Sequence, residues 1–319
     1  MIATYEHLPV MHERVVELLA PALAGDTPLM VDATLGLGGH SEALLAAVQN
    51  LELLGIDRDA EALERSRERL APFSSRVTLV HARYDEIGEV LDQYFPGRAP
   101  HGILFDLGVS SLHLDKPERG FSYSVDAPLD MRMDQSDSVT AELILRTYSA
   151  SELADIFQRF GDEKLAKRYA DAIVTARSIA PLERTGQLVN VLQAATPYAL
   201  KDQGHPAKRV FQALRIEVNR ELDSLYRALP EALNRLAVGG RIVVMSYQSG
   251  EDRFVKSEIR RRSQSLAPLG LPAELPGHLP EFLEITRGAE KASESEMSVN
   301  PRATPVRVRA AEKLRKVDR

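Results

Sequence analysis

Short apolar segments alternate with helix-like segments over the first third of the chain, and this alternation restricts the fold more than any other feature. The apolar segments are rich in Val, Ile and Leu and span residues 28–33, 51–57, 76–81 and 101–107. Helix-like segments follow the first three of them, at residues 40–48, 59–70 and 84–94. This order predicts right-handed βαβ units on a mostly parallel sheet, and therefore a Rossmann-like α/β fold.

The alternation stops after the fourth apolar segment. The next matching strand lies at residues 239–247, after a long helix that ends near Leu236. A connection in such a sheet normally takes a few residues, whereas roughly 95 intervene here. We therefore predict an inserted domain at residues 114–210, with residues 1–113 and 211–319 forming the sheet domain.

The insert has the pattern of a helical domain. Ser149 and Glu152 have the spacing of a capping box. An apolar stripe follows at Leu153, Ile156, Phe157 and Phe160. Gly161 suits the end of that helix. We interpret the stripe as a buried helix face rather than as a set of cofactor contacts.

The end of the chain has a different composition. Residues 264–300 are rich in Pro, Gly, Ser and Glu, which predicts a loop with some disorder. Residues 281–287 and 303–311 nevertheless predict two antiparallel strands at the edge of the sheet.

Composition and charge exclude several chemistries. The chain contains no cysteine, so disulfides, thiolate metal sites and a cysteine nucleophile are excluded. No stretch approaches the length of a membrane span, and charges come too early for a secretory signal, so we expect a cytoplasmic protein. The net charge of −6 hides a basic segment, residues 205–262, with 12 Lys and Arg against 7 Asp and Glu. Such a segment fits either a footprint for nucleic acid or a solvated helix face, and charge alone slightly favours the second.

Three glycines, Gly36, Gly38 and Gly39, stand where the first predicted strand turns into its helix. Backbone without side chains approaches a ligand closely, and a helix N-terminus offers N–H donors. Asp57 ends the second strand, where a carboxylate can accept hydrogen bonds from both hydroxyls of a ribose. Together they indicate a cofactor that contains adenosine. The plain alternatives are a tight turn and a helix cap, although Asp59 fits the cap better.

The loop favours one cofactor over another. A dinucleotide fingerprint that starts at Gly36 would end at Ser41 instead of Gly or Ala, which disfavours a nicotinamide-dependent oxidoreductase. S-adenosylmethionine has no pyrophosphate and suits a wider polar loop. Tyr84 follows the third strand and could stack on an adenine, but an ordinary half-buried tyrosine fits equally well. Asp106 ends the fourth strand, where a transferase of this layout has its reacting centre, and Gly108 lets the backbone come close.

Several longer motifs resemble those of the MraW/RsmH-type bacterial methyltransferases, which methylate N4 of a cytidine in 16S ribosomal RNA. The longest and most specific are GFSYSVDAPLDMRMD and RVFQALRIEVN. Shorter ones are HLPVM, DATLGLGGHS, GIDRD, GILFDLGVSS, EDRFVK and NPRA. The resemblance covers nearly the whole chain. It implies a class I methyltransferase fold that uses S-adenosylmethionine, with a helical insert that recognises the RNA substrate.

The resemblance also implies a set of cofactor contacts. These are Gly38, Gly39, His40, Asp57, Tyr84, Asp106 and His113. Two of them depart from the family, which usually has Phe at position 84 and Gln at position 113. The family motif SFHSLEDR reads SYQSGEDR here, so Gln248 leaves no histidine at its position and Gly250 replaces leucine.

Methyl transfer to an exocyclic amine needs nitrogen, carbon and sulfur held nearly collinear, with acceptors for the amine hydrogens. We predict Asp106 beside this centre as the catalytic residue, and a purely cofactor-binding role stays open. Methylation at cytosine C5 is excluded, because it needs a cysteine thiolate that adds to the ring. Phe121 and Tyr123 either stack on the target base or pack inside the protein.

The helix that begins near Pro206 carries a polar stripe. Its members are Lys208, Gln212, Arg215 and Asn219. The stripe either contacts phosphates or faces solvent. The expected partner is 16S ribosomal RNA within a small ribosomal subunit, with no membrane and no metal, and a homodimer is left open. The remaining alternative is a non-catalytic RNA-binding assembly factor.

Overall fold

The computed structural model describes residues 9–200, 204–265, 267 and 278–316. The chain divides into two compact units, which we describe separately. Unit 1 comprises residues 1–108 and 223–319, and unit 2 comprises residues 109–222. The start of the HLPVM motif and most of residues 266–277 in the predicted loop lie outside the described residues.

Unit 1 is built on a seven-stranded sheet with the strand order β3-β2-β1-β4-β5-β7-β6. The strands are β1 Leu29–Asp32, β2 Glu52–Asp57, β3 Val77–His81, β4 Gly102–Asp106, β5 Arg241–Ser246, β6 Phe282–Glu284 and β7 Arg307–Lys313. The first five strands run parallel, and β7 runs antiparallel to both β5 and β6. This topology confirms the predicted α/β fold with a mostly parallel sheet.

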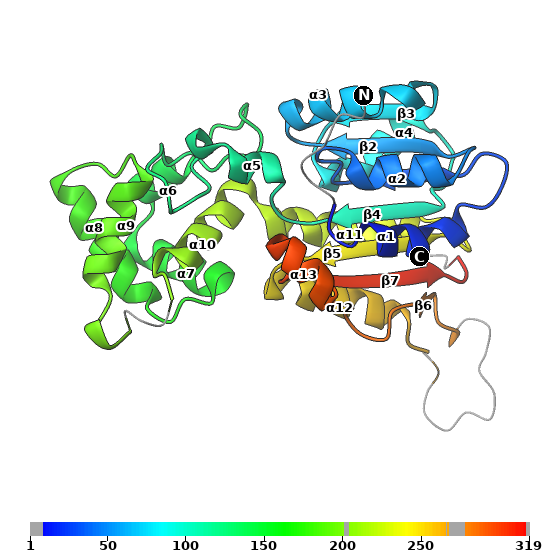
Figure 1. Cartoon of the computed structure of the whole chain (residues 1–319). Coiled ribbons are helices and arrows are strands. Elements are labelled where there is room, and N and C mark those ends of the chain that lie inside the picture. Colours follow the sequence, from blue (N-terminus) through cyan, green and yellow to red (C-terminus); the bar gives the residue numbers. More distant parts are fainter. Residues whose placement is uncertain (1–8, 201–203, 266, 268–277, 317–319) are drawn as a thin grey trace. The chain divides into compact units, whose positions relative to one another are not determined.

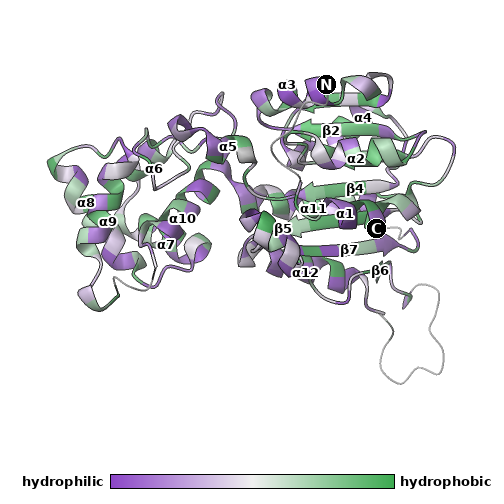
Figure 2. Ribbon diagram, viewed as in Figure 1, coloured by the Kyte–Doolittle hydropathy of each residue, from purple (hydrophilic) through white to green (hydrophobic). Residues whose placement is uncertain are grey.

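The central strands are buried along nearly their whole length, because helices cover a parallel sheet on both faces. Figure 2 shows these strands in the colour of hydrophobic residues. The helices of this part of the chain are α1 His12–Leu19, α2 Gly39–Ala47, α3 Ala60–Arg69, α4 Ile87–Tyr94, α11 Glu221–Arg235, α12 Ser249–Arg262 and α13 Glu294–Val299. In Figure 1, α1 and α2 lie in front of the sheet, and α12 packs against β5, β6 and β7. Every helix in the described residues is too short or too polar to cross a bilayer.

The C-terminal strands confirm the predicted antiparallel pair, with β6 at the edge and β7 inside the sheet. Helix α13 falls in the segment that we predicted as loop. Its first turn is held by Ser293, whose hydroxyl accepts a hydrogen bond from the N–H of Glu296. A local cap therefore stabilises a short helix in a polar segment without the apolar spacing that predicts one.

Unit 2 is helical. Its α-helices up to the junction are α5 Ser111–Asp115, α6 Ala141–Thr147, α7 Ala150–Gly161, α8 Ala166–Ile179, α9 Thr185–Ala195 and α10 Ala207–Asn219. The predicted capping box is present, because the N–H of Ser149 donates to the Glu152 carboxylate at 2.7 Å and the N–H of Glu152 donates to the Ser149 hydroxyl at 3.3 Å. The apolar stripe of α7 lies in the hydrophobic core of this unit, as predicted.

Gly161 has a different role from the predicted one. It is the last residue of α7, but the left-handed backbone that ends the helix belongs to Asp162, with φ of 49°. A Cβ atom on Gly161 would stand 2.6 Å from the carbonyl oxygen of Arg209 in α10. The glycine is therefore needed for the close contact between α7 and α10 rather than for helix termination.

Candidate functional site

The loop between β1 and α2 has a conformation that needs its glycines. Gly36 and Gly38 have φ of 52° and 75°, in the left-handed region that other residues rarely adopt. A Cβ atom on Gly39 would stand 2.3 Å from Cγ of Pro9. The loop therefore needs backbone without side chains at the start of α2, where Pro9 packs on Gly39, on the side of the sheet where parallel strands end.

Asp57 ties the tip of β2 to this loop. One oxygen of its carboxylate accepts a hydrogen bond from the N–H of Gly36 at 2.7 Å, and the other accepts from the N–H of Asp59 at 2.8 Å. Asp59 caps α3 by accepting a hydrogen bond from the N–H of Glu61. This confirms the prediction that Asp59, rather than Asp57, is the helix cap. The carboxylate of Asp57 stands at the glycine loop, as the predicted ribose contact requires.

Asp106 is held by two hydrogen bonds at the end of β4. Its N–H donates to the Thr34 hydroxyl at 2.6 Å, and its Oδ1 accepts from the Tyr247 hydroxyl at 2.8 Å. Its Oδ2 lies 3.5 Å from Nε2 of His40. This geometry fixes the carboxylate in place where β1, β4 and β5 end.

His40 supplies the observation that tests whether a polar cofactor fits here. The residue is 6% exposed, and neither ring nitrogen has a hydrogen-bond partner among the described residues. Buried polar groups in proteins almost always have such a partner. An imidazole in this state, next to the carboxylate of Asp106 and the glycine loop, fits a site that receives a polar ligand such as S-adenosylmethionine.

Two groups at the site, Asp32 and Tyr247, have raised pKa values. Burial raises the pKa of Asp32 to about 6, although the Ser41 hydroxyl donates to its Oδ2 at 2.6 Å. Burial and the neighbouring Asp106 carboxylate raise the pKa of the Tyr247 hydroxyl well above its usual value. Tyr247 is therefore a hydrogen-bond donor at any physiological pH.

Our sequence interpretation missed Asp32, Thr34, Ser41 and Tyr247. The available signal was a polar side chain at or just after a strand end, within the DATLGLGGHS and MSY segments. Gln248, the departure from the family motif, has a structural role. Its backbone N–H and side-chain amide both donate to Glu251 in the first turn of α12, at 3.2 Å and 2.8 Å.

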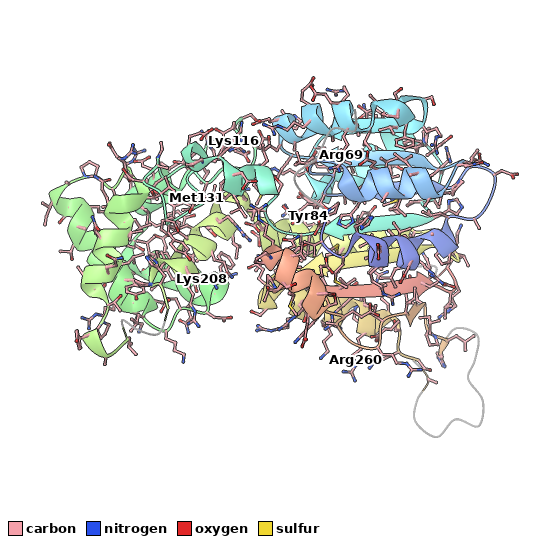
Figure 3. All side chains as sticks on the ribbon, viewed as in Figure 1. Arg69, Tyr84, Lys116, Met131, Lys208 and Arg260 are labelled. Carbon is pink, nitrogen blue, oxygen red and sulfur yellow. The ribbon has the colours of Figure 1, made fainter. Side chains whose placement is uncertain are left out.

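Tyr84 begins a short 3₁₀ helix, Tyr84–Glu86, directly after β3. Its ring packs edge-to-face on Phe105 of β4, with ring centroids 5.8 Å apart. Figure 3 labels Tyr84 beside the ends of the parallel strands. The ring is positioned from within unit 1, and its contact with an adenine stays a prediction.

His113 belongs to unit 2, where it is buried and stacks on Phe121 with ring centroids 5.1 Å apart. Phe121 itself lies in the hydrophobic core of unit 2. The predicted contact of His113 with the cofactor stays a prediction. Tyr123 stacks on His205 with centroids 4.5 Å apart, so its ring is already in contact with another ring of unit 2.

Most side chains of the polar stripe on α10 bond to other residues of unit 2. The two predicted roles, contact with phosphates and exposure to solvent, describe none of these bonds. The Gln212 amide donates to the carbonyl oxygen of Phe160. Arg215 forms a bidentate ion pair with Glu221, at 2.7 Å and 2.8 Å. The buried side chain of Asn219 makes a third contact within unit 2, with the backbone of Met131 and Met133. Lys208 is the exposed member of the stripe and is labelled in Figure 3.

The side chain of Asn219 holds a tight turn in the segment LDMRM. It donates to the carbonyl oxygen of Met131 and accepts from the N–H of Met133, both at 2.8 Å. Met131 has φ of 62°, which is unusual for a residue with a side chain. The two hydrogen bonds stabilise this strained conformation inside the core of unit 2.

Comparison with known proteins gives a consistent result. The MraW methylase family matches residues 4–314. A protein named ribosomal RNA small subunit methyltransferase H from Leifsonia xyli subsp. xyli is 59% identical, over 97% of this chain and 95% of its own length. Proteins of the same name from Clavibacter michiganensis subsp. michiganensis and Nocardia farcinica are 58% and 56% identical, over 97% of this chain and 97% and 96% of their own lengths.

The chain belongs to the MraW methylase family. This confirms the predicted family, the methyltransferase activity and S-adenosylmethionine as methyl donor. The nicotinamide-dependent alternative is wrong. Among the residues that the structure describes, no group of three His, Asp or Glu side chains is arranged to hold a metal ion.

Proposed function

We propose that this MraW-family protein transfers the methyl group of S-adenosylmethionine to N4 of a cytidine in 16S ribosomal RNA, within the small ribosomal subunit. The observation that carries the proposal is the cluster of His40, Asp106 and Tyr247 beside the glycine loop of unit 1. The names of the relatives, which specify a ribosomal RNA of the small subunit, support the choice of substrate. Such RNA is made in the cytoplasm of a bacterium, and we place the protein there.

In this proposal, different residues of unit 1 hold different parts of the cofactor. The backbone of Gly38 and Gly39 and the ring of His40 would hold its amino-acid end, and Asp57 would accept hydrogen bonds from the ribose. Tyr84 would stack on the adenine, and a contact of His113 with the cofactor stays a prediction. When bound, S-adenosylmethionine supplies an electrophilic methyl carbon on a sulfonium that leaves as a thioether.

Asp106 then acts on the attacking nitrogen. The lone pair of the cytosine amine is delocalised into the ring, so an acceptor for its hydrogens must hold the nitrogen in line with the methyl carbon. The Asp106 carboxylate is such an acceptor, because Tyr247 fixes its other oxygen at 2.8 Å. As the nitrogen–carbon bond forms and the carbon–sulfur bond breaks, the nitrogen loses one proton, which Asp106 can accept.

Unit 2 recognises the RNA in this proposal. It is an all-helical unit whose chain leaves and re-enters unit 1 between β4 and β5. The predicted homodimer stays a prediction, which sedimentation of the purified protein checks.

The test is methyl transfer to small ribosomal subunits that lack the modification. With isotopically labelled S-adenosylmethionine, label is expected on one cytidine of 16S ribosomal RNA, and digestion to nucleosides identifies N4-methylcytidine. Asp106→Asn keeps the size of the side chain but removes its charge, and is expected to lower the rate while binding of the cofactor persists. Binding of RNA without any transfer of label would instead support the non-catalytic assembly factor.

A further inference from the structure

Helix α12 carries three cationic side chains that have no acidic partner in the part of the chain that the structure describes. Arg253, Lys256 and Arg260 are exposed, and none of them forms an ion pair or a hydrogen bond with another described residue. Their spacing of three and four residues places them on one face of the helix. The opposite face carries Val255 and Ile259, which are buried where α12 packs on the sheet. Figure 3 labels Arg260 on this helix, and Figure 2 shows α12 largely in the colour of hydrophilic residues.

Several exposed arginines elsewhere in unit 1 are paired with acids, although the exposed Arg287 forms no ion pair with a described residue. On α3, Arg65 pairs with Glu61 at 3.1 Å and Arg67 pairs with Glu64 at 2.6 Å. On α12 itself, Arg261 pairs with Glu258 at 2.7 Å. The three cations Arg253, Lys256 and Arg260, which share one helix face, therefore differ from the paired arginines of α3 and from Arg261.

The acids of α12 are directed away from the unpaired cations. Asp252 pairs with Arg307 and Arg309 of β7, at 3.2 Å and 2.7 Å. Glu258 pairs with Arg261 and with the buried Arg262. Among the described residues, three positive charges thus have no acidic partner along about 10.5 Å of helix axis, the length of seven residues.

We propose that this basic face of α12, defined by Arg253, Lys256 and Arg260, binds the phosphate backbone of the substrate RNA. Neighbouring like charges on a helix repel each other in the free protein, and a row of phosphates removes that repulsion. The face supplies three of the twelve basic residues of the segment 205–262, whereas Arg215 of the polar stripe on α10 is already paired with Glu221. The inference rests on the proposed function, since it takes ribosomal RNA as the ligand.

The test is the salt dependence of binding to unmodified 16S ribosomal RNA transcribed in vitro. Each phosphate contact contributes about 0.7 to the slope of log Kobs against log salt concentration for a single strand. The triple variant Arg253→Gln, Lys256→Gln, Arg260→Gln is expected to reduce that slope by about 2. Its affinity for S-adenosylmethionine should stay that of the unmodified protein, which shows that unit 1 is folded.

A matched control removes the same number of charges from paired positions. Arg65→Gln, Arg67→Gln, Arg261→Gln changes three arginines that are 52%, 59% and 58% exposed, and it should leave the slope unchanged. An equal fall in both variants, or none in either, overturns the proposal. A triple variant that instead loses binding to phosphatidylserine vesicles, with its RNA slope intact, overturns it in favour of a membrane surface. Failure of the proposed function is a separate result, in which the unmodified protein neither binds this RNA nor methylates small subunits.

Discussion

The buried carboxyl group of Asp32 predicts a loss of stability as pH rises. The residue lies at the end of β1 and is 2% exposed. Its pKa in the folded protein is about 6, whereas the reference value is 3.8. Between those values the folded state holds a proton that the unfolded chain has lost, so rising pH favours unfolding.

The size of the effect follows from the shift. Two pKa units correspond to about 3 kcal/mol, at 1.36 kcal/mol per unit. This stabilisation is present below pH 4, where the carboxyl group is protonated in both states. Most of it disappears between pH 4 and pH 6, and above pH 6 the full cost of a buried charge remains.

Asp32→Asn is the variant that isolates the effect. The amide oxygen can accept from the N–H of Thr34 as Oδ1 does at 3.3 Å, and the amide nitrogen can donate to the Ser41 hydroxyl, which rotates freely. The variant keeps both contacts but has no charge to bury. Its stability relative to the unmodified protein is expected to rise by about 3 kcal/mol in total as pH increases from 4 to 7.5, mostly below pH 6.

Denaturant unfolding of both proteins over this pH range measures the difference. All other titrating groups are shared, so their contributions cancel when one profile is subtracted from the other. The transition of unit 1 is identified by its shift on addition of S-adenosylmethionine. Two parallel pH profiles would refute the reasoning, because they would show that Asp32 is ionised at low pH in the folded protein.

Three further substitutions test other contacts. Asp57→Ala removes the acceptor at the glycine loop and is expected to weaken S-adenosylmethionine binding by at least tenfold in calorimetry, about 1.4 kcal/mol; unchanged affinity removes Asp57 from the site. Gly161→Ala places a methyl group against the backbone of Arg209 and should destabilise unit 2 by about 1–3 kcal/mol in denaturant unfolding, whereas an unchanged midpoint would show that α7 and α10 can separate freely. Tyr247→Phe deletes the hydrogen bond to Asp106, and we expect about a tenfold lower kcat with unchanged RNA affinity, since a hydrogen bond to a charged group contributes about 1.5–3 kcal/mol; equal kcat values would contradict a positioning role.

Features that depend on neighbouring residues could be predicted from the sequence. The strands, the capping box at Ser149 and the cap at Asp59 are local patterns of apolar spacing and polar side chains. The positions of the glycines at the first crossover are of the same kind, whereas their left-handed conformation was not predicted. Each of these was identified because its physical cause lies within a few residues of its effect.

Features that join distant segments could not be predicted in this way. Tyr247 and Asp106 are 141 residues apart in the chain, and no local pattern pairs them. Helical spacing placed Arg215 and Asn219 on one face of α10, but it did not show what packs against that face. A glycine at position 161 is typical of a helix end, but this glycine is required because the backbone of α10, later in the chain, packs against it.

The insertion of unit 2 between β4 and β5 has a consequence for synthesis on the ribosome. β4 pairs with β1 on one side and with β5 on the other, so its second edge stays open until β5 has been translated. At 5–20 residues per second, the roughly 134 residues in between take about 7–27 s. During that interval the nascent chain exposes an apolar strand edge of the kind that pairs with foreign strands. A chaperone that shields such edges should therefore increase the yield of folded protein, and a circular permutant that starts at unit 2 should need it less.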